Sequence, residues 1–313
     1  TGCCSLDDIN DARILAVNYG FHHMIIDIRE EFGDYIIDNF VSEYTAGRTP
    51  NPCVLCNTHI KWDALLRRAD QLGCEFIATG HYANVREENG RHVISKGKDE
   101  NKDQSYVLWG LSQKALARTK FPLGKFTKPE IRKMALDRGH EDLAKKSESY
   151  EICFVPDNDY RGFLKRKVPT LEQEVKGGDL IDMKGNVMGQ HEGFPFYTIG
   201  QRKGLGIATG EPLYVIRINA ENNTVVLGQK EDLKRKTMTV RRPNYIKYDA
   251  LPQDEEILTK VRYKDSGMMS RAVVNEVGEI EVDFYDDVQG IAPGQSAVFY
   301  EGNDLLGGGF IAR

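Results

Sequence analysis

The stretch Glu75-Phe76-Ile77-Ala78-Thr79-Gly80 has the pattern of a short apolar strand that stops at a glycine. It follows a segment, Ile60 to Leu72, in which apolar residues recur at helical spacing. Further upstream, Met24-Ile25-Ile26 has the pattern of a second buried strand, and residues 30–45 again show helical periodicity. This alternation predicts an α/β domain with a mostly parallel sheet, and such sheets bind ligands at the carboxyl ends of their strands.

Beyond about Asp159 the sequence changes character, because glycines become frequent and helical periodicity fades. Before that point, Thr127-Lys128-Pro129-Glu130 predicts a helix start with a capping threonine, an early proline and a glutamate three residues on. The final third holds short strand-like segments at regular spacing, which predict a small antiparallel barrel or sandwich. These segments are residues 238–240, 258–263, 271–274, 280–284 and 296–300.

The chain has 313 residues, of which 40% are hydrophobic, and a formal net charge of −5. A chain of this length buries a large core and divides into two or three domains. No apolar run reaches the roughly 18 residues that a membrane span needs, so we expect no membrane partner. The net charge does not indicate a nucleic-acid binder, although basic clusters such as Arg202-Lys203 and Lys234-Arg235-Lys236 leave that function open.

Six cysteines, at positions 3, 4, 53, 56, 74 and 153, lack the regular spacing of a disulfide scaffold. This pattern predicts reduced thiols in a cytoplasmic protein. Two of them form a C-x-x-C pair in Gly47-Arg48-Thr49-Pro50-Asn51-Pro52-Cys53-Val54-Leu55-Cys56-Asn57, where the prolines predict a rigid loop before a helix. We expect the helix N-terminus to favour the thiolate form of the pair. By itself the pair fits a redox motif or half of a zinc site.

Six motifs follow one another along nearly the whole chain. They are Ala46–Pro52 with Leu55-Cys56-Asn57, Ile77–Tyr82, Asn101–Tyr106, Ile152-Cys153-Phe154, Tyr197–Gly206 and Pro293–Val298. In this order they resemble the motifs of the tRNA-specific 2-thiouridylases, the MnmA family.

The resemblance implies a fold of three domains. It implies an N-terminal ATP-pyrophosphatase domain with an adenine-nucleotide-hydrolase-like parallel sheet over residues 1–157, a central tRNA-contacting domain over 158–226, and a C-terminal antiparallel β-barrel over 227–313. The family begins with a first strand and an S-G-G-x-D-S-S phosphate loop, and no such motif occurs in the 313 residues. We therefore expect a truncated N-terminal domain that binds ATP poorly, because backbone N–H groups of that loop hold the pyrophosphate.

The implied reaction is the ATP-dependent 2-thiolation of the wobble uridine, position 34, of tRNA. ATP with Mg²⁺ adenylates the uridine O2, and a cysteine persulfide then supplies sulfur to C2. The implied partners are the tRNAs for Lys, Glu and Gln, together with a sulfur-relay protein or cysteine desulfurase as donor. The implied location is the cytoplasm.

By resemblance, Cys153 carries the persulfide, and Cys56 is the nucleophile that ends in a disulfide with Cys153. Cys53 departs from the family, in which many members carry an aspartate proposed as general base. As a thiol, Cys53 can take this role of base, although its ordinary pKa is much higher than that of a carboxylate. In the alternative, Cys53, Cys56 and Cys153 ligate three irons of a [4Fe–4S] cluster. A zinc site would lack a fourth ligand. Without the family, Cys153 would be interpreted as a core cysteine between Ile152 and Phe154.

The remaining site residues are expected to contact substrates. Gly80 has no Cβ, so it is expected to let the adenosine of ATP approach the backbone. Arg202 and Lys203, in a glycine-rich loop, suit phosphates. Residues expected to bind tRNA are Asn51, Pro52 and Cys53 beside the target base, then His81, Lys102, Asp103 and Gln104, and on the barrel Arg262, Tyr263 and Gln295.

Two other classes of function compete with the enzyme. A non-catalytic tRNA-binding remnant would explain the missing phosphate loop. An ATP ligase similar to argininosuccinate synthase, acting on a small molecule, would explain the α/β pattern but not the paired cysteines or the barrel.

Overall fold

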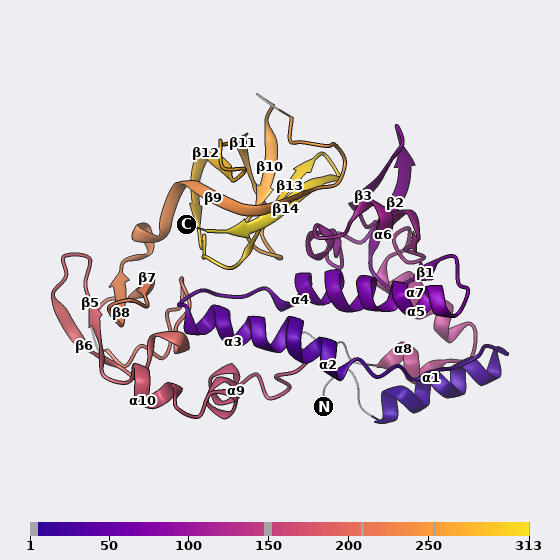
Figure 1. Ribbon diagram of the computed structural model, residues 1–313, viewed down its shortest axis with the longest axis horizontal. Helices are drawn as coiled ribbons and strands as arrows, with labels where there is room; N and C mark the ends of the chain where they lie inside the picture. Colours follow the sequence, from indigo (N-terminus) through magenta and orange to yellow (C-terminus); the bar gives the residue numbers. More distant parts are fainter. Residues whose placement is uncertain (1–5, 147–151, 208–209, 253–254, 313) are drawn as a thin grey trace.

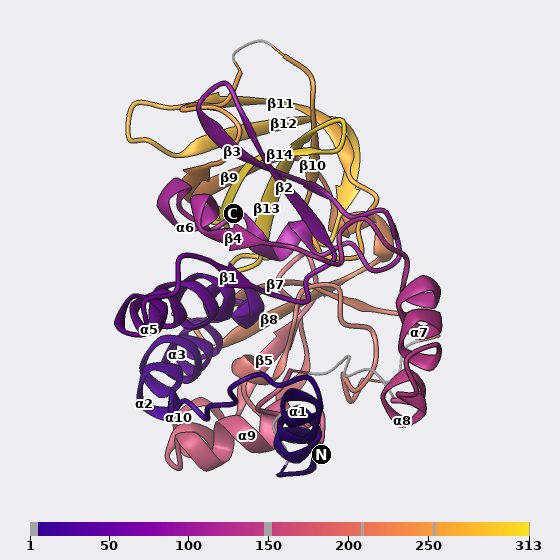
Figure 2. The same ribbon diagram turned by 90° about the vertical axis from the view of Figure 1, so that its right-hand side faces the viewer.

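The computed structural model describes residues 6–146, 152–207, 210–252 and 255–312. In Figure 1 a mostly helical N-terminal part lies on the right and along the bottom, a small sheet domain at the lower left, and a barrel above both. Figure 2, turned by 90°, keeps the barrel above the rest of the molecule. Cys3 and Cys4 lie outside the described residues.

The N-terminal part begins with helices, as predicted for residues 30–45 and 60–72. Two of its helices pass through a wider π-helical stretch before they return to α geometry. The elements are α1 (Leu6–Asn18), α2 (Arg29–Phe32), the π-helical η1 (Gly33–Ile37), α3 (Asp38–Thr45), α4 (Pro52–Leu55), the π-helical η2 (Cys56–Ala64) and α5 (Leu65–Gln71). Stretches of π-helix are rare and often occur at functional sites, and η2 begins at the second cysteine of the pair.

A parallel strand pair follows these helices. β1 (Ile77–Ala78) pairs with β4 (Thr119–Lys120), with Ile77 opposite Thr119. The predicted strand Met24–Ile26 is wrong: this segment is irregular, and Ile25 is 73% exposed. An apolar triplet forms a strand only where a neighbour supplies a hydrogen-bonding edge and a covering layer. Among the described residues, parallel pairing in this part is confined to β1 and β4.

The second half of the N-terminal part contains the predicted capped helix. In α7 (Lys128–Leu136), the Thr127 hydroxyl accepts from the Glu130 backbone N–H, and the Glu130 carboxylate accepts from the Thr127 N–H at 2.6 Å. This reciprocal capping confirms the sequence prediction. The other elements here are η3 (Ser105–Leu108), α6 (Gln113–Ala117) and α8 (Glu141–Lys145).

The central domain is a four-stranded sheet with short helices, in the order β6-β5-β8-β7. Its β5–β8 pair is parallel and the other pairs are antiparallel. Phe40 and Tyr44 of α3 pack in its core with Phe163, Leu164 and Val215. Helix α3 of the N-terminal part therefore contributes to the hydrophobic core of the central domain. Its elements are α9 (Tyr160–Lys167), α10 (Leu171–Val175), β5 (Gly178–Ile181), β6 (Val187–His191), η4 (Phe194–Phe196), β7 (Tyr214–Asn219) and β8 (Thr224–Gly228).

The C-terminal part is a closed antiparallel barrel. Its strands neighbour one another in the order β13-β10-β11-β12-β9-β14, and β14 pairs back with β13. This confirms the predicted barrel and, with the α/β part, the predicted fold class. Its elements are η5 (Lys230–Leu233), β9 (Lys234–Tyr245), β10 (Ile257–Lys260), β11 (Met268–Val274), β12 (Ile280–Gln289), β13 (Ser296–Glu301) and β14 (Asp304–Ile311).

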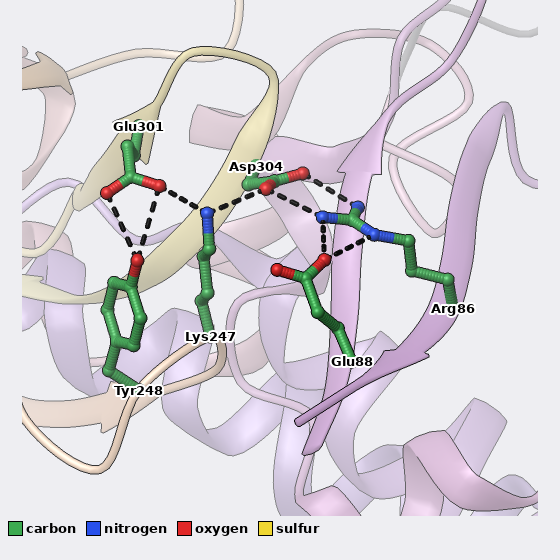
Figure 3. Close-up of polar contacts among 6 residues, drawn as sticks. All are labelled: Arg86, Glu88, Lys247, Tyr248, Glu301 and Asp304. Carbon is green, nitrogen blue, oxygen red and sulfur yellow. Dashed lines mark hydrogen bonds and ion pairs between the residues drawn. The ribbon is translucent and has the colours of Figure 1, made fainter. Parts of the chain in front are cut away.

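A hairpin of the N-terminal part extends the barrel sheet. β2 (Ala83–Glu88) and β3 (Arg91–Lys96) join it at β14. Figure 3 shows the ion-pair network at this junction: Nη1 and Nη2 of the Arg86 guanidinium each donate to one carboxylate oxygen of Asp304 at 2.8 Å, and Lys247 bridges Asp304 and Glu301. These cations, Arg86 first, lower the pKa of Asp304. The hairpin is thus fixed to the barrel by bidentate charge pairing.

The helix that bears the cysteine pair and the barrel share one hydrophobic core. Val54 and Trp62 lie in the same buried cluster as Val298, Tyr300 and Leu305 of the barrel. Movement of the barrel relative to this helix would therefore expose apolar surface, at about 25 cal/mol per Å². In the described part of the chain, no helix combines the length and the apolar character that crossing a membrane requires.

Candidate active site

The C-x-x-C pair lies at the start of the helical stretch that begins at Pro52. Pro52 occupies the first helical turn, where a missing N–H costs nothing, and it is buried together with Pro50. Cys53 is exposed, and Cys56, three residues on, is half-buried. Because positions i and i+3 lie on one face of a helix, both thiols belong to the same side of the first turn.

The barrel holds the loop in front of this helix through polar contacts. Gln295 donates from Nε2 to the backbone oxygens of Thr49 at 3.1 Å and Pro50 at 2.9 Å. The Thr49 N–H in turn donates to the Pro293 oxygen at 2.8 Å. Gln295, which we expected to contact tRNA, thus has its amide N–H group directed at the cysteine loop.

Gly294 allows this contact. Its φ of +89° is a conformation that side-chain-bearing residues rarely adopt, and a Cβ added there would lie 2.8 Å from the Thr49 oxygen. Pro293-Gly294-Gln295 belongs to one of the six motifs, but we predicted no role for Gly294. A glycine in a motif indicates a special backbone conformation or a close contact. The sequence does not reveal that the contact is with Thr49, 245 positions away.

A buried tyrosine lies between Asn51 and Tyr263. Tyr106 is 1% exposed, its hydroxyl donates to the Ser296 backbone oxygen at 2.8 Å, and the Asn51 side chain lies beside this hydroxyl. The ring of Tyr263 meets the Tyr106 ring edge-on, with centroids 6.0 Å apart. The structure therefore brings together Asn51 and Tyr263, two of the residues predicted to bind tRNA, through a residue to which sequence reasoning gave no role.

The thiol of Cys53 differs from our expectation. Although the residue keeps exposed surface, the protein around its thiol excludes water and raises its pKa above the ordinary value. The nearby positive charge of Lys61 opposes this rise only in part. This direction runs against our expectation that the helix start favours the thiolate at Cys53, because desolvation disfavours the charged form.

Cys153 lies on an exposed turn, and its two neighbours are anchored in the central core. Ile152 and Phe154 are partly buried against that core, and Phe154 meets Phe40 edge-on with centroids 5.1 Å apart. The interpretation of Cys153 as a buried core cysteine is therefore wrong. Its thiol is accessible to another molecule.

The three cysteines do not form a metal-binding group. Across the described residues, which include Cys53, Cys56 and Cys153, no three His, Cys, Asp or Glu side chains are grouped so that they could hold a metal ion. This arrangement does not fit a cluster with three cysteine ligands.

His81 is part of the core. It is 6% exposed, its Nδ1 lies 2.9 Å from the Thr79 hydroxyl, and its ring packs beside Trp62 and Phe121. Burial, with a contribution from the charge of Lys61, lowers its pKa to about 3, so the ring is neutral. This geometry favours a structural role over the tRNA contact that we expected.

Asp103 and Gln104 shape the loop that carries them. Asp103 accepts hydrogen bonds from the backbone N–H groups of Gly97 and Ser105, and from the Ser105 hydroxyl at 2.8 Å. Gln104 accepts from the Tyr82 N–H at 3.1 Å. Lys102 is half-buried beside them. The acceptors of both side chains therefore bind this chain's own backbone.

Gly80 and the glycine-rich loop lie at open positions. Gly80 is exposed two residues after β1, at its carboxyl end, and an added Cβ would only touch Leu123 at 3.7 Å. Arg202 and Lys203 are exposed, and Arg202 lines a cavity of about 740 Å³ with Gly204 and Gly206. Both places leave room for a ligand.

Comparison with known proteins matches three family models in succession along the chain. Residues 1–157 match a family model described as the tRNA methyl transferase HUP domain. Residues 161–229 match the corresponding PRC-barrel domain, and residues 235–311 match an aminomethyltransferase beta-barrel domain. A protein of Amoebophilus asiaticus named tRNA-specific 2-thiouridylase MnmA is 64% identical over 99% of this chain and 83% of its own length. The chain belongs to the tRNA-specific 2-thiouridylase family.

Other proteins named tRNA-specific 2-thiouridylase also match this chain over nearly its whole length. The protein of Cytophaga hutchinsonii is 64% identical over 99% of this chain and 84% of its own length, and that of Salinibacter ruber is 54% identical over 99% and 82%. Because the HUP-domain match begins at residue 1, it gives no support to our expectation that the phosphate-loop segment is missing.

Proposed function

We propose that the protein is a tRNA-uridine 2-sulfurtransferase that uses ATP to thiolate uridine 34. The observation that carries this proposal is the 64% identity, over 99% of the chain, to a protein named tRNA-specific 2-thiouridylase. The geometry supports it, because a half-buried Cys56 at a helix start and an exposed Cys153 suit the two thiols of a sulfur-transfer reaction.

The chemistry proceeds in two stages. Attack of the uridine O2 on the α-phosphate of ATP, with Mg²⁺, releases pyrophosphate and makes O2 part of an adenylate leaving group. The terminal sulfur of a Cys153 persulfide then attacks C2 and AMP departs. The Cys56 thiolate attacks the Cys153 sulfur, so the C2-bound sulfur leaves as 2-thiouridine and a Cys56–Cys153 disulfide remains. An external thiol reductant restores both cysteines.

We assign the other residues to the two substrates. Gly80 contacts the adenosine of ATP at the carboxyl end of β1, where parallel sheets bind ligands. Asn51, Pro52 and Cys53 lie beside the flipped uridine, and Cys53, whose pKa is raised, acts there as a protonated thiol at neutral pH. Lys102 and the barrel residues Arg262 and Tyr263 contact the tRNA.

The [4Fe–4S] alternative has less support, because the three cysteines do not form one ligand group in the described structure. Its test is direct: iron and acid-labile sulfide are measured after anaerobic purification. An iron-free, active protein excludes the cluster, whereas activity that depends on stoichiometric iron excludes the persulfide route.

Further parts of the proposal concern partners, location and domains. The substrates are the tRNAs for Lys, Glu and Gln, the sulfur donor is a relay protein or cysteine desulfurase, and the reaction takes place in the cytoplasm. The domain boundaries are 1–157, 158–226 and 227–313, with α3 packed on the central domain.

The activity is tested with purified protein, tRNA, ATP, Mg²⁺ and a persulfide donor. We expect 2-thiouridine at position 34 by nucleoside mass spectrometry, with AMP formed only when tRNA is present. Binding of tRNA without thiolation would favour the non-catalytic remnant, and AMP formation without tRNA would favour the small-molecule ligase.

A further inference from the structure

A cavity of about 360 Å³ opens where the cysteine loop, the central domain and the barrel meet. Thr49 lines it from the loop, Tyr214 from the start of β7, Lys230 from the start of η5, and Arg262 and Gly290 from the barrel. Its volume lies near the lower end of the range for small-molecule pockets, which suits a single nucleotide unit.

The cavity is positively charged. Two of its lining residues, Lys230 and Arg262, are cations, and none is an aspartate or glutamate. Neither cation makes an ion pair with any other residue that the structure describes. In a chain of net charge −5, two uncompensated cations at one cavity indicate an anionic ligand.

The backbone around Arg262 orients its guanidinium. Gly290 has a φ of +78°, and an added Cβ would lie 3.1 Å from Nη1 and 3.2 Å from Cζ of Arg262. The guanidinium therefore lies against a backbone that has no side chain at this position. A planar group held in this way presents its N–H donors in a fixed direction, which suits a phosphate.

The cavity is close to the segment that faces the target base. Thr49 lines it, and Cys53 is four residues further on, so the extended chain between them spans at most about 14 Å. Gln295, another lining residue, binds the backbone of Thr49 and Pro50. Tyr263, next to Arg262, is 40% exposed.

We propose that this cavity binds a phosphate of the tRNA anticodon loop, close to the target uridine, with Lys230 and Arg262 as its ligands. The inference rests on the proposed function and adds a binding subsite to it. The chemistry recognised is an anionic phosphate, which an RNA phosphodiester or a free phosphate compound supplies. Proximity to the base-facing segment favours the RNA.

The test measures binding of an anticodon stem-loop RNA by fluorescence anisotropy at several salt concentrations, without ATP or sulfur donor. Lys230→Ala and Arg262→Ala are each expected to weaken binding by about 3- to 10-fold and to reduce the slope of log K against log salt by about 0.7 to 0.9. Lys230→Arg, which keeps the charge, is expected to retain the wild-type slope. Lys184→Ala, at the exposed turn between β5 and β6, removes the same charge elsewhere and is the matched control.

The outcomes separate the subsite from the function. If the double variant Lys230→Ala/Arg262→Ala binds the stem-loop RNA with wild-type affinity and salt dependence, the proposed subsite is wrong. A double variant that loses ATP or inorganic phosphate binding, but not RNA binding, also overturns it and gives the cavity to a free phosphate compound. Wild-type protein that does not bind the stem-loop overturns the proposed function instead. Circular dichroism of each variant verifies that a loss of binding is not a loss of fold.

Discussion

The loop that precedes Cys53 and Cys56 is held by polar contacts from the barrel, whereas the segment that bears Cys153 is held by aromatic packing in the central core. Gln295 binds the backbone of the first segment at two oxygens. In the second, Phe154 packs against Phe40 while the cysteine before it stays exposed. Directional hydrogen bonds thus fix the orientation of the loop before Cys53, whereas packing of Phe154 anchors the chain next to the exposed Cys153.

This difference matches the two tasks that we propose. Hydrogen bonds are directional, so the barrel can orient the cysteine loop toward a base that must react at one atom. Packing of Phe154 is sufficient for Cys153, which in the proposed reaction first receives sulfur from another protein and therefore needs exposure. The two segments meet different requirements with different kinds of contact.

Substitution of the thiols is expected to have the largest effect. Cys56→Ser and Cys153→Ser should each reduce thiolation by at least about a thousandfold, because each removes a group that forms a covalent bond. The two variants should differ in loading: Cys56→Ser still accepts a persulfide on Cys153, and Cys153→Ser does not. Mass spectrometry of the intact protein after incubation with donor measures this. Cys74→Ser, at another exposed thiol, is the control, and wild-type rates in either test variant would contradict the assignment.

Gly294→Ala is expected to have the next largest effect. The new Cβ would meet the Thr49 oxygen at 2.8 Å, so the loop must shift, and we expect a roughly 10- to 100-fold loss of kcat/KM. Gly302→Ala is the matched control, because Gly302 also has a positive φ, +57°, but no atom within 4 Å of the added Cβ. Both variants bear the cost of a positive φ, about 1 to 2 kcal/mol. Equal activity of the two would show that the loop contact does not matter.

Gln295→Ala is expected to reduce kcat/KM about tenfold, since it removes two hydrogen bonds worth about 1 kcal/mol each. The readout that distinguishes positioning from tRNA contact is alkylation of Cys53 and Cys56 without tRNA. A positioning role changes these rates, and a pure tRNA contact leaves them unchanged and only raises KM for tRNA. Gln173→Ala, at an exposed glutamine of α10, is the control.

The smallest expected effect is on the pH dependence of the alkylation rate of Cys53. Because its pKa is raised above the ordinary value, its thiolate fraction near pH 7.5 is lower than that of an unperturbed thiol, and its alkylation should accelerate up to and beyond pH 9. Lys61 lowers this pKa, so Lys61→Ala should slow alkylation at neutral pH by a few-fold. Peptide-resolved alkylation from pH 6.5 to 10 measures both effects. A Cys53 profile that reaches its plateau below pH 8 would disagree with the desolvation described here.

Local sequence signals predicted several elements correctly. Thr127, Pro129 and Glu130 predicted the capped start of α7, since all three act within one turn. Alternating residues predicted β11, β12 and β13. The strand β14 was missed, because Gly307, Gly308 and Gly309 do not resemble a strand; an added Cβ at Gly308 would lie 2.7 Å from the Trp109 ring. The glycines are needed for close packing that no local pattern reveals.

The candidate site was also predicted only in part, because several of its contacts join residues that are distant in the sequence. The motifs identified Cys53, Cys56 and Cys153, but the contacts of Gln295 and Tyr106 depend on residues far away in the chain. His81 was assigned to tRNA because its neighbours Gly80 and Thr79 indicated a ligand edge. Its burial beside Trp62 could not be inferred from them.

The sequence by itself determined the chemistry that the protein carries and the local elements that present it. It placed two prolines at the start of a helix, a cysteine pair at its first turn, and a third cysteine between two apolar residues. Only the tertiary structure decided which thiol is exposed, which way the pKa of Cys53 moves, and that Gln295 holds a loop 246 positions away. The physical reason is that burial and hydrogen-bond partners are set by residues brought together in the fold, whereas helix capping and strand pattern are set by neighbours in the chain.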